Sequence, residues 1–181
     1  IEQSIEEQSL PFFLSGLFVW PSLQRKSSVT FLSDRLLRLG LPMIPAIFVL
    51  MLARMSASGL ALVREPSEVA FVQNLVYYLS QAWRTPDYGI WERGHKRNEG
   101  VAEINASSLG MAKAALESVA GFDPLPGNAS AVHVLADDIA LARETLEALL
   151  PRESESKETD AALLAIVGYP AFAVDDAALA A

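Results

Sequence analysis

The 181-residue sequence contains no cysteine, and this absence removes several kinds of chemistry from consideration. Disulfide bonds, thiolate metal sites and cysteine nucleophiles all require that side chain. Only two histidines occur, His95 and His133, and they lie too far apart in sequence to suggest a metal site. We therefore predict no metal and no cofactor, and we expect both histidines at the surface or at helix caps.

Positive charge is also scarce, because 14 basic side chains stand against 22 acidic ones and the formal net charge is −8. A chain of this charge repels a phosphate backbone, so we predict no nucleic-acid binding.

Long apolar runs are missing as well. The two candidates, residues 11–20 and 41–55, are interrupted by prolines and fall short of the roughly 20 apolar residues that cross a bilayer. The acidic start, with Glu2, Glu6 and Glu7, lacks the basic region of a secretory signal.

Hydrophobic residues make up 51% of the sequence, which is enough for a real core, and they are spaced for helices. Residues 46–57 are apolar nearly all round, as in a buried helix. A second helix is predicted from Pro66 to about Trp83, with Ser67 as a candidate N-cap. No strand pairing or hairpin turn is indicated, so the predicted fold class is all-α.

Three further helices are predicted in the C-terminal half. One begins at the capping serines Ser107 or Ser108 and stops at Gly121, and one is capped by Asp137 and Asp138 and ends before Pro151. A short one covers residues 160–167. By contrast, residues 1–43 show no clean period, and we leave them as an unassigned N-terminal segment. Residues 44–181 form the predicted helical domain.

The loop at residues 86–100 carries the candidate site, the Trp91-Glu92-Arg93 turn. A carboxyl group beside a tryptophan can stay protonated and can then donate a proton to a glycosidic oxygen. Arg93 and Lys96 would lower its pKa instead. The simpler interpretation is that Trp91 packs while Glu92 pairs with Arg93 or Lys96, and the residues alone favour that simpler interpretation.

This loop and several later blocks resemble the regulatory subunits of phosphorylase kinase, the alpha type more than the beta type. The similarity extends over about residues 46–181, and its blocks occur in the same order. They are Asp87-Tyr88-Gly89-Ile90-Trp91-Glu92-Arg93-Gly94, residues 103–117, His133-Val134-Leu135-Ala136-Asp137-Asp138, Leu149-Leu150-Pro151-Arg152, and residues 160–176. Residues 37–42 depart from the family, which has an acidic loop with tryptophan and glycine at this position.

The resemblance implies a fragment of an (α/α)6 toroid similar to the glucoamylases of glycoside hydrolase family 15. It implies a regulatory subunit without catalytic activity, which controls glycogen breakdown with a catalytic gamma subunit, the other regulatory subunit and calmodulin. The implied location is cytoplasmic, with contact to the inner face of the cell membrane through parts outside this chain. We find no basic amphipathic helix here that would bind calmodulin.

The resemblance also assigns a role to the loop. It places a general acid at Glu92, vestigial in a regulatory subunit, with Trp91 and Arg93 as substrate-binding residues. An inverting hydrolase needs a second carboxylate as base, roughly 6.5–9.5 Å away, and in the family this base comes from a part of the barrel beyond residue 181. The alternatives are a glycoside hydrolase acting on α-linked glucans through Glu92, and a glucan-binding module without turnover.

Overall fold

The computed structural model describes residues 43–90, 101–126 and 130–175. All of them belong to one compact unit, Arg38–Ala181. Residues 1–42 of the unassigned segment 1–43 lie outside the described residues, and so does the stretch 91–100 that contains the predicted site.

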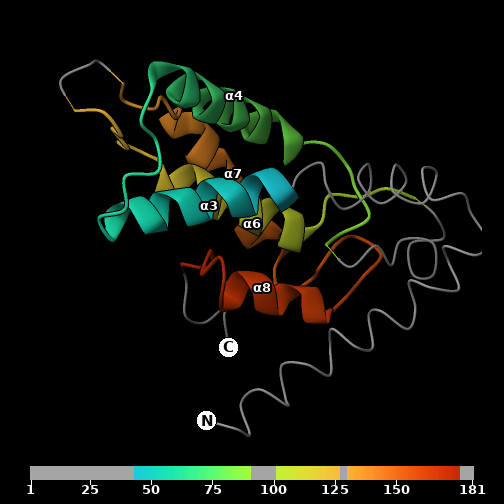
Figure 1. Cartoon of the computed structure of the whole chain (residues 1–181). Helices are drawn as coiled ribbons and strands as arrows, with labels where there is room; N and C mark the ends of the chain where they lie inside the picture. The colour runs from blue at the N-terminus through green and yellow to red at the C-terminus, as the bar shows by residue number, and fades with distance from the viewer. Residues whose placement is uncertain (1–42, 91–100, 127–129, 176–181) are drawn as a thin grey trace, which may run out of the picture. The chain divides into compact units, whose positions relative to one another are not determined.

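Four α-helices and one short helical segment make up the described part of the chain (Figure 1). They are α3 (Met43–Ala57), α4 (Pro66–Ala82), α6 (Ala106–Ser118), α7 (Ala136–Leu149), and the 3-10 turn η1 (Ala161–Leu163) that continues into α8 (Leu164–Val167). No strand occurs among these residues, whose one β-bridge is an isolated antiparallel pair between Asp87 and Glu103. The prediction of an all-α chain is confirmed for the described residues.

Helix α6 is the centre of this unit, and α3, α4, α7 and α8 all contact it. Its residues from Ala106 to Leu116 are all buried, so it has no solvent-facing side in that stretch. Small side chains make this possible, because alanine, serine and glycine let neighbouring helices approach closely. At Gly110 the approach is tightest, since an added Cβ would lie 2.7 Å from Cγ2 of Ile166 in α8.

Three helix starts differ from the sequence predictions in the residue that caps them, and α3 begins at Met43 and not at residue 46. Glu65, and not Ser67, is the N-cap of α4, in a reciprocal capping box with Glu68. Asn105 is the N-cap of α6, so the two serines predicted as caps lie inside the helix and are buried. Leu135 is the N-cap of α7, and the two aspartates at its start occupy the first turn. Their negative charge there interacts favourably with the helix dipole.

The predicted helix ends agree better with the structure. α4 ends at Trp83 as its C-cap and α7 ends immediately before Leu150-Pro151. Gly59 and Gly121 follow α3 and α6 with φ of 93° and 76°, a conformation in which glycine avoids the penalty of a Cβ. None of the helices in the described ranges is long and apolar enough to cross a membrane.

Candidate functional site

The stem of the loop that carries Trp91, Glu92 and Arg93 is closed by backbone hydrogen bonds. The Asp87 amide donates to the Glu103 carbonyl at 2.8 Å, and the Glu103 amide donates back at 2.9 Å. The side chain of Asn105 reinforces this pair, because its Nδ2 donates to Oδ1 of Asp87 at 2.6 Å and to the Glu103 carbonyl at 2.9 Å. The N-cap residue of α6 therefore ties both sides of the loop to the central helix.

Gly89 brings the first side of the loop against buried polar groups. Its φ of 78° favours glycine, and its amide donates to Oδ1 of Asp87 at 2.8 Å. A Cβ at this position would lie 3.2 Å from Oδ1 of Asn105, 3.2 Å from Oε1 of Glu153 and 3.3 Å from Nζ of Lys157. A side chain here would press directly on these three groups.

Glu153, in the segment after α7, is 1% exposed and receives hydrogen bonds from the first turn of α6. Both the backbone amide of Ser107, at 3.2 Å, and its hydroxyl donate to the Glu153 carboxylate. The Glu153 carbonyl accepts from the Ala106 amide at 2.7 Å. Burial raises the pKa of Glu153 from 4.5 to about 7, although the bonds from Ser107 and the charge of Lys157 oppose that rise.

Lys157 also contacts these buried polar groups. Its Nζ donates to the Tyr88 carbonyl at 3.2 Å and to Oδ1 of Asn105 at 3.1 Å. Burial likewise raises the pKa of Asp87, and hydrogen bonds from Ser108, Gly89 and Asn105 limit the increase. We call Asp87, Gly89, Asn105, Glu153 and Lys157 the stem cluster.

The carboxylate of Glu103 binds the turn at residues 154–156. Its Oε2 accepts from Ser154 Oγ at 2.5 Å, from Ser156 Oγ at 2.9 Å and from the Ser156 amide at 3.2 Å. Partial burial raises the pKa of Glu103, but these hydrogen bonds outweigh it and hold the pKa below its usual value. The turn is thereby fastened to the second side of the loop stem.

The described residues of the stem cluster pack closely against one another. The space between Gly89, Ile90, Glu153 and Lys157 is too narrow for a water molecule. In the described part of the chain, no group of histidine and acidic side chains is arranged to hold a metal ion. What the cluster can do is fix the position at which the polypeptide leaves and re-enters the helical unit.

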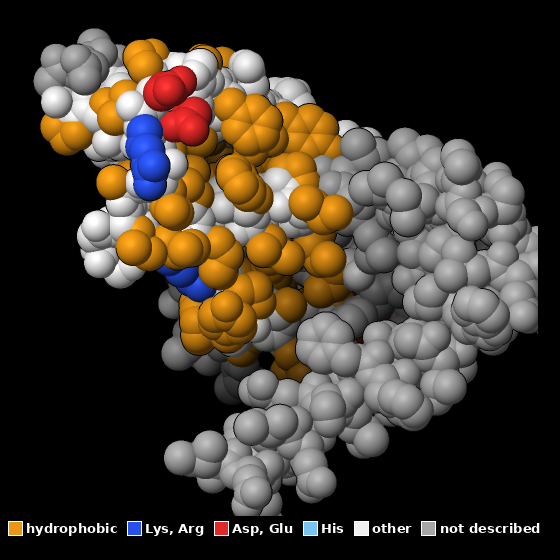
Figure 2. Space-filling model, viewed as in Figure 1, with side chains coloured by type: hydrophobic (Ala, Val, Ile, Leu, Met, Phe, Trp, Pro, Cys, Tyr) orange, Lys and Arg blue, Asp and Glu red, His pale blue; other side chains and the backbone are white. Residues whose placement is uncertain are grey.

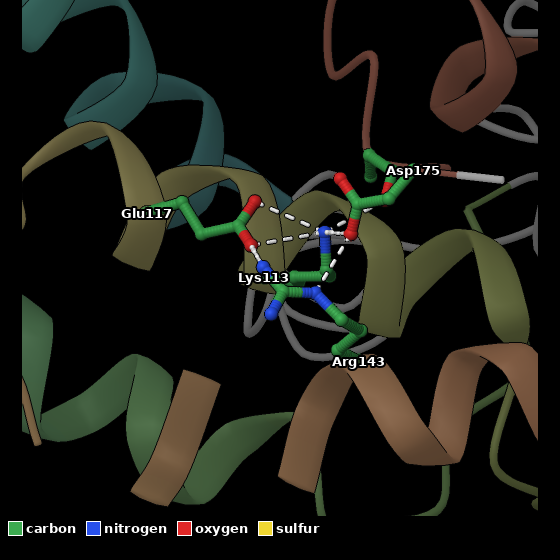
Figure 3. A network of polar contacts seen from close by, with 5 residues as sticks. Lys113, Glu117, Arg143 and Asp175 are labelled. Atoms are coloured by element: carbon green, nitrogen blue, oxygen red, sulfur yellow. Dashed lines mark hydrogen bonds and ion pairs between the residues drawn. The ribbon is translucent and has the colours of Figure 1, made fainter. Parts of the chain in front are cut away.

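A second polar network joins α6, α7 and the last described residues, and the sequence did not reveal it (Figure 3). Lys113 is fully buried, and its Nζ donates to Asp175 Oδ2 at 2.9 Å, to Glu117 Oε2 at 3.0 Å and to the Ala173 carbonyl at 2.8 Å. Arg143 of α7 donates to Glu117 and to Asp175 at 2.8 Å each. The hydrogen bond from Lys113, helped by Arg143, holds the pKa of Asp175 below its ordinary value.

The predicted site residues themselves are not among those described. Trp91, Glu92 and Arg93 lie in residues 91–100, and His95 lies there too, so their predicted roles stay predictions. His133 is exposed, as expected. Its backbone is held by Gln73, which accepts from the His133 amide at 2.7 Å and donates to its carbonyl at 2.9 Å.

The sequence model of the family described as "Glycosyl hydrolases family 15" matches residues 44–169, which include the loop stem and the stem cluster. The chain belongs to this family. Among curated proteins it is similar to a probable phosphorylase b kinase regulatory subunit alpha of Drosophila melanogaster, with 54% identity over 137 residues. The corresponding protein of Caenorhabditis elegans is 54% identical over 134 residues.

The skeletal muscle isoform of that alpha subunit from Oryctolagus cuniculus is 50% identical over 137 residues. These matches cover 72–74% of this chain but only 11% of each relative, so the chain spans about a tenth of their length. The resemblance to alpha-type regulatory subunits, inferred from the residue blocks, is confirmed.

Proposed function

We propose that this chain is part of an alpha-type regulatory subunit of phosphorylase kinase and acts in the control of glycogen breakdown. The observation that carries the proposal is the identity of 50–54% to curated alpha subunits over about three quarters of the chain. On this proposal the chain is not catalytic. Its partners are the catalytic gamma subunit, the other regulatory subunit and calmodulin, and its location is cytoplasmic with membrane contact through other parts of the polypeptide.

The proposed architecture is part of an (α/α)6 toroid. The family match supports it, and the helical content of the described residues is compatible with it. The stem of the loop that carries the candidate site is held by four buried or half-buried polar side chains, Asp87, Asn105, Glu153 and Lys157.

The test is co-purification of the full-length polypeptide with a phosphorylase kinase catalytic subunit. We expect the two to form a stable complex, and we expect the kinase activity in that complex to differ from that of the free catalytic subunit. If the full-length polypeptide neither binds the catalytic subunit nor changes its activity, the regulatory assignment fails.

The match to a glycosyl hydrolase family supports a second candidate, hydrolysis or binding of α-linked glucans at Trp91, Glu92 and Arg93. Maltooligosaccharide turnover by the full-length polypeptide separates the two. The regulatory proposal expects no turnover. Turnover that Glu92→Gln abolishes would establish the hydrolase. Heat of binding without turnover, lost in Trp91→Ala, would establish a glucan-binding module.

A further inference from the structure

Two oppositely charged side chains, Glu153 and Lys157, are enclosed at the base of the loop stem. Hydrophobic side chains predominate on the face of the helical unit that Figure 2 shows, and few charged ones appear there. Glu153 and Lys157 lie inside instead, 1% and 6% exposed. Buried charges are normally compensated by an opposite charge or by hydrogen bonds. How these two are compensated therefore decides how the stem responds to a change of protonation.

Glu153 and Lys157 are neighbours that do not form an ion pair. Both belong to one closed turn, in which the Glu153 amide donates to the Glu158 carbonyl at 2.7 Å and the Ser154 amide donates to the Lys157 carbonyl at 3.2 Å. A Cβ at Gly89 would lie 3.2 Å from Oε1 of Glu153 and 3.3 Å from Nζ of Lys157, so both groups lie beside the same point. None of the ion pairs within the described ranges joins them.

The Lys157 ammonium holds the loop stem instead. It donates to the Tyr88 carbonyl on the first side of the stem at 3.2 Å, and to Oδ1 of Asn105 on the second side at 3.1 Å. Both acceptors are uncharged. This arrangement suits a protonated Glu153, because a neutral carboxyl group offers the ammonium no negative charge to compete with the two acceptors.

Other groups around Glu153 leave its charge uncompensated. Arg152, the preceding residue, donates to the carbonyls of Ser154 and Glu155, and its side chain is 46% exposed. Helix α6 contributes only the uncharged donors of Ser107. Neither segment brings a second cation to the buried carboxyl group.

The remaining charged groups around the pair are acidic. Burial, and to a smaller extent the negative charge of Asp160 before η1, raises the pKa of Glu153. Asp87 and Glu103, on the two sides of the stem, interact with the charge of Lys157. In the described part of the chain, Lys157 is thus the one cation in reach of Glu153.

We propose that the stem cluster is a proton-linked latch: when Glu153 loses its proton, the Lys157 ammonium moves to the carboxylate and releases the Tyr88 carbonyl. The first side of the loop stem is then held less firmly. Charge-assisted hydrogen bonds are roughly twice as strong as neutral ones, so the carboxylate outcompetes a carbonyl for the ammonium. The bond to Tyr88 is the longer of the two that Lys157 makes, and a lysine chain is flexible enough to move.

Hydrogen exchange read by mass spectrometry at pH 6 and pH 8 tests the latch, in the 181-residue chain and in the full-length polypeptide. The rates are corrected for the intrinsic effect of pH on exchange, and residues 109–116 in the middle of α6 are the internal reference. Between the two pH values we expect the amides of Asp87 and Gly89 to lose about five-fold more protection than the reference, because their side of the stem opens locally. Equal loss at the stem and at the reference would be global destabilisation and would overturn the proposal.

Glu153→Gln cannot ionise, so its stem protection relative to the reference should be the same at both pH values. Glu155→Gln removes an exposed carboxyl group of the same turn and is the matched control, which should respond like the wild type. A response that persists in Glu153→Gln would assign it to another group, such as Asp87, and would overturn the latch.

Lys157→Met separates the latch from the effect of Glu153 on stability. Glu153 still ionises in this variant, so the unfolding free energy should still fall as the pH rises, but no contact to Tyr88 is left to release. The pH response of the stem relative to the reference should therefore vanish. A full stem response in Lys157→Met would overturn the proposal. None of these measurements uses kinase binding or glucan turnover, so the latch and the proposed function can fail separately.

Discussion

At the scale of single residues, two glycines with nearly the same backbone conformation have very different surroundings. Gly89 and Gly121 have φ of 78° and 76°. A Cβ at Gly89 would meet three polar atoms between 3.2 and 3.3 Å away, whereas nothing lies within 4 Å of one at Gly121. Replacing either glycine by alanine therefore carries the same conformational penalty. Replacing Gly89 carries a steric penalty as well.

We predict that Gly89→Ala destabilises the chain more than Gly121→Ala. Gly121→Ala, the control, should lower the unfolding free energy by about 1 kcal/mol, the usual penalty of an alanine in the left-handed conformation. Gly89→Ala should cost more, because Asn105, Glu153 and Lys157 are buried and have little room to move. Urea denaturation of the 181-residue chain measures the unfolding free energy of both variants. Equal losses would mean that the side chains of the stem cluster move aside at no measurable cost.

Because burial raises the pKa of Glu153, we predict that the stability of the chain depends on pH. Its pKa is about 7 in the folded chain and near 4.5 when unfolded, so the folded state binds the proton more tightly. The penalty for ionising the buried carboxyl is absent below pH 4.5, grows as the pH rises to 7, and is complete above that. It amounts to on the order of 3 kcal/mol, from the free energy of one pKa unit.

The measurement is the unfolding free energy of wild type and of Glu153→Gln from pH 5 to pH 8. Glutamine cannot ionise, so the wild type should lose stability relative to this variant as the pH rises. The exposed neighbour Glu155→Gln serves as the control and should run parallel to the wild type. A difference between wild type and Glu153→Gln that is constant with pH would refute the raised pKa.

At the scale of elements, the packing of α8 on α6 depends on the absence of one side chain. Gly110 lies in the buried part of α6, where an alanine would otherwise favour the helix by about 1 kcal/mol. Its Cβ would approach Ile166 to 2.7 Å, well inside contact distance. At this position the steric clash with Ile166 should therefore outweigh the higher helix propensity of alanine.

We predict that Gly110→Ala destabilises the chain by about 1–3 kcal/mol, the usual range for an overpacked core. Ile166→Ala should destabilise it separately through a cavity. The double variant should be more stable than the sum of the two losses predicts, because the smaller residue makes room for the new methyl group. Additive losses in thermal denaturation would show that the contact is relieved by backbone movement instead.

The start of α6 illustrates what sequence reasoning could and could not find. Ser107 and Ser108 were predicted as caps because serine is common at helix starts. In the structure Ser107 donates to Glu153, a residue far along the chain, and Asn105 takes the N-cap position. Local preference identified the right region of the chain but assigned these side chains the wrong role.

At the scale of the whole molecule, the Lys113 network connects segments that are distant in sequence. Lys113 and Glu117 come from α6, Arg143 comes from α7, and Asp175 belongs to the last described segment. The two cations and two anions balance one another. The network thus fixes three segments of the helical unit at one point (Figure 3).

We predict that Lys113→Met destabilises the chain more than Arg143→Met. Loss of the buried ammonium leaves the Ala173 carbonyl without its donor, which should cost about 1–3 kcal/mol. The Arg143 side chain is 46% exposed, and loss of such pairs typically costs about 0–1 kcal/mol. Chemical denaturation gives the comparison. The reverse order would mean that the burial of Lys113 is itself unfavourable.

Patterns in the sequence were sufficient to predict that the chain is helical, where most of its helices end, and to which proteins it is similar. These follow from periodicity, from glycine and proline, and from blocks of residues in order, all of which are local along the chain. The roles of Glu153, Lys113 and Asp175, and the exposure of Phe172, became apparent from the three-dimensional structure alone. Those properties depend on burial and on partners that are distant in sequence, and residue type alone does not specify either.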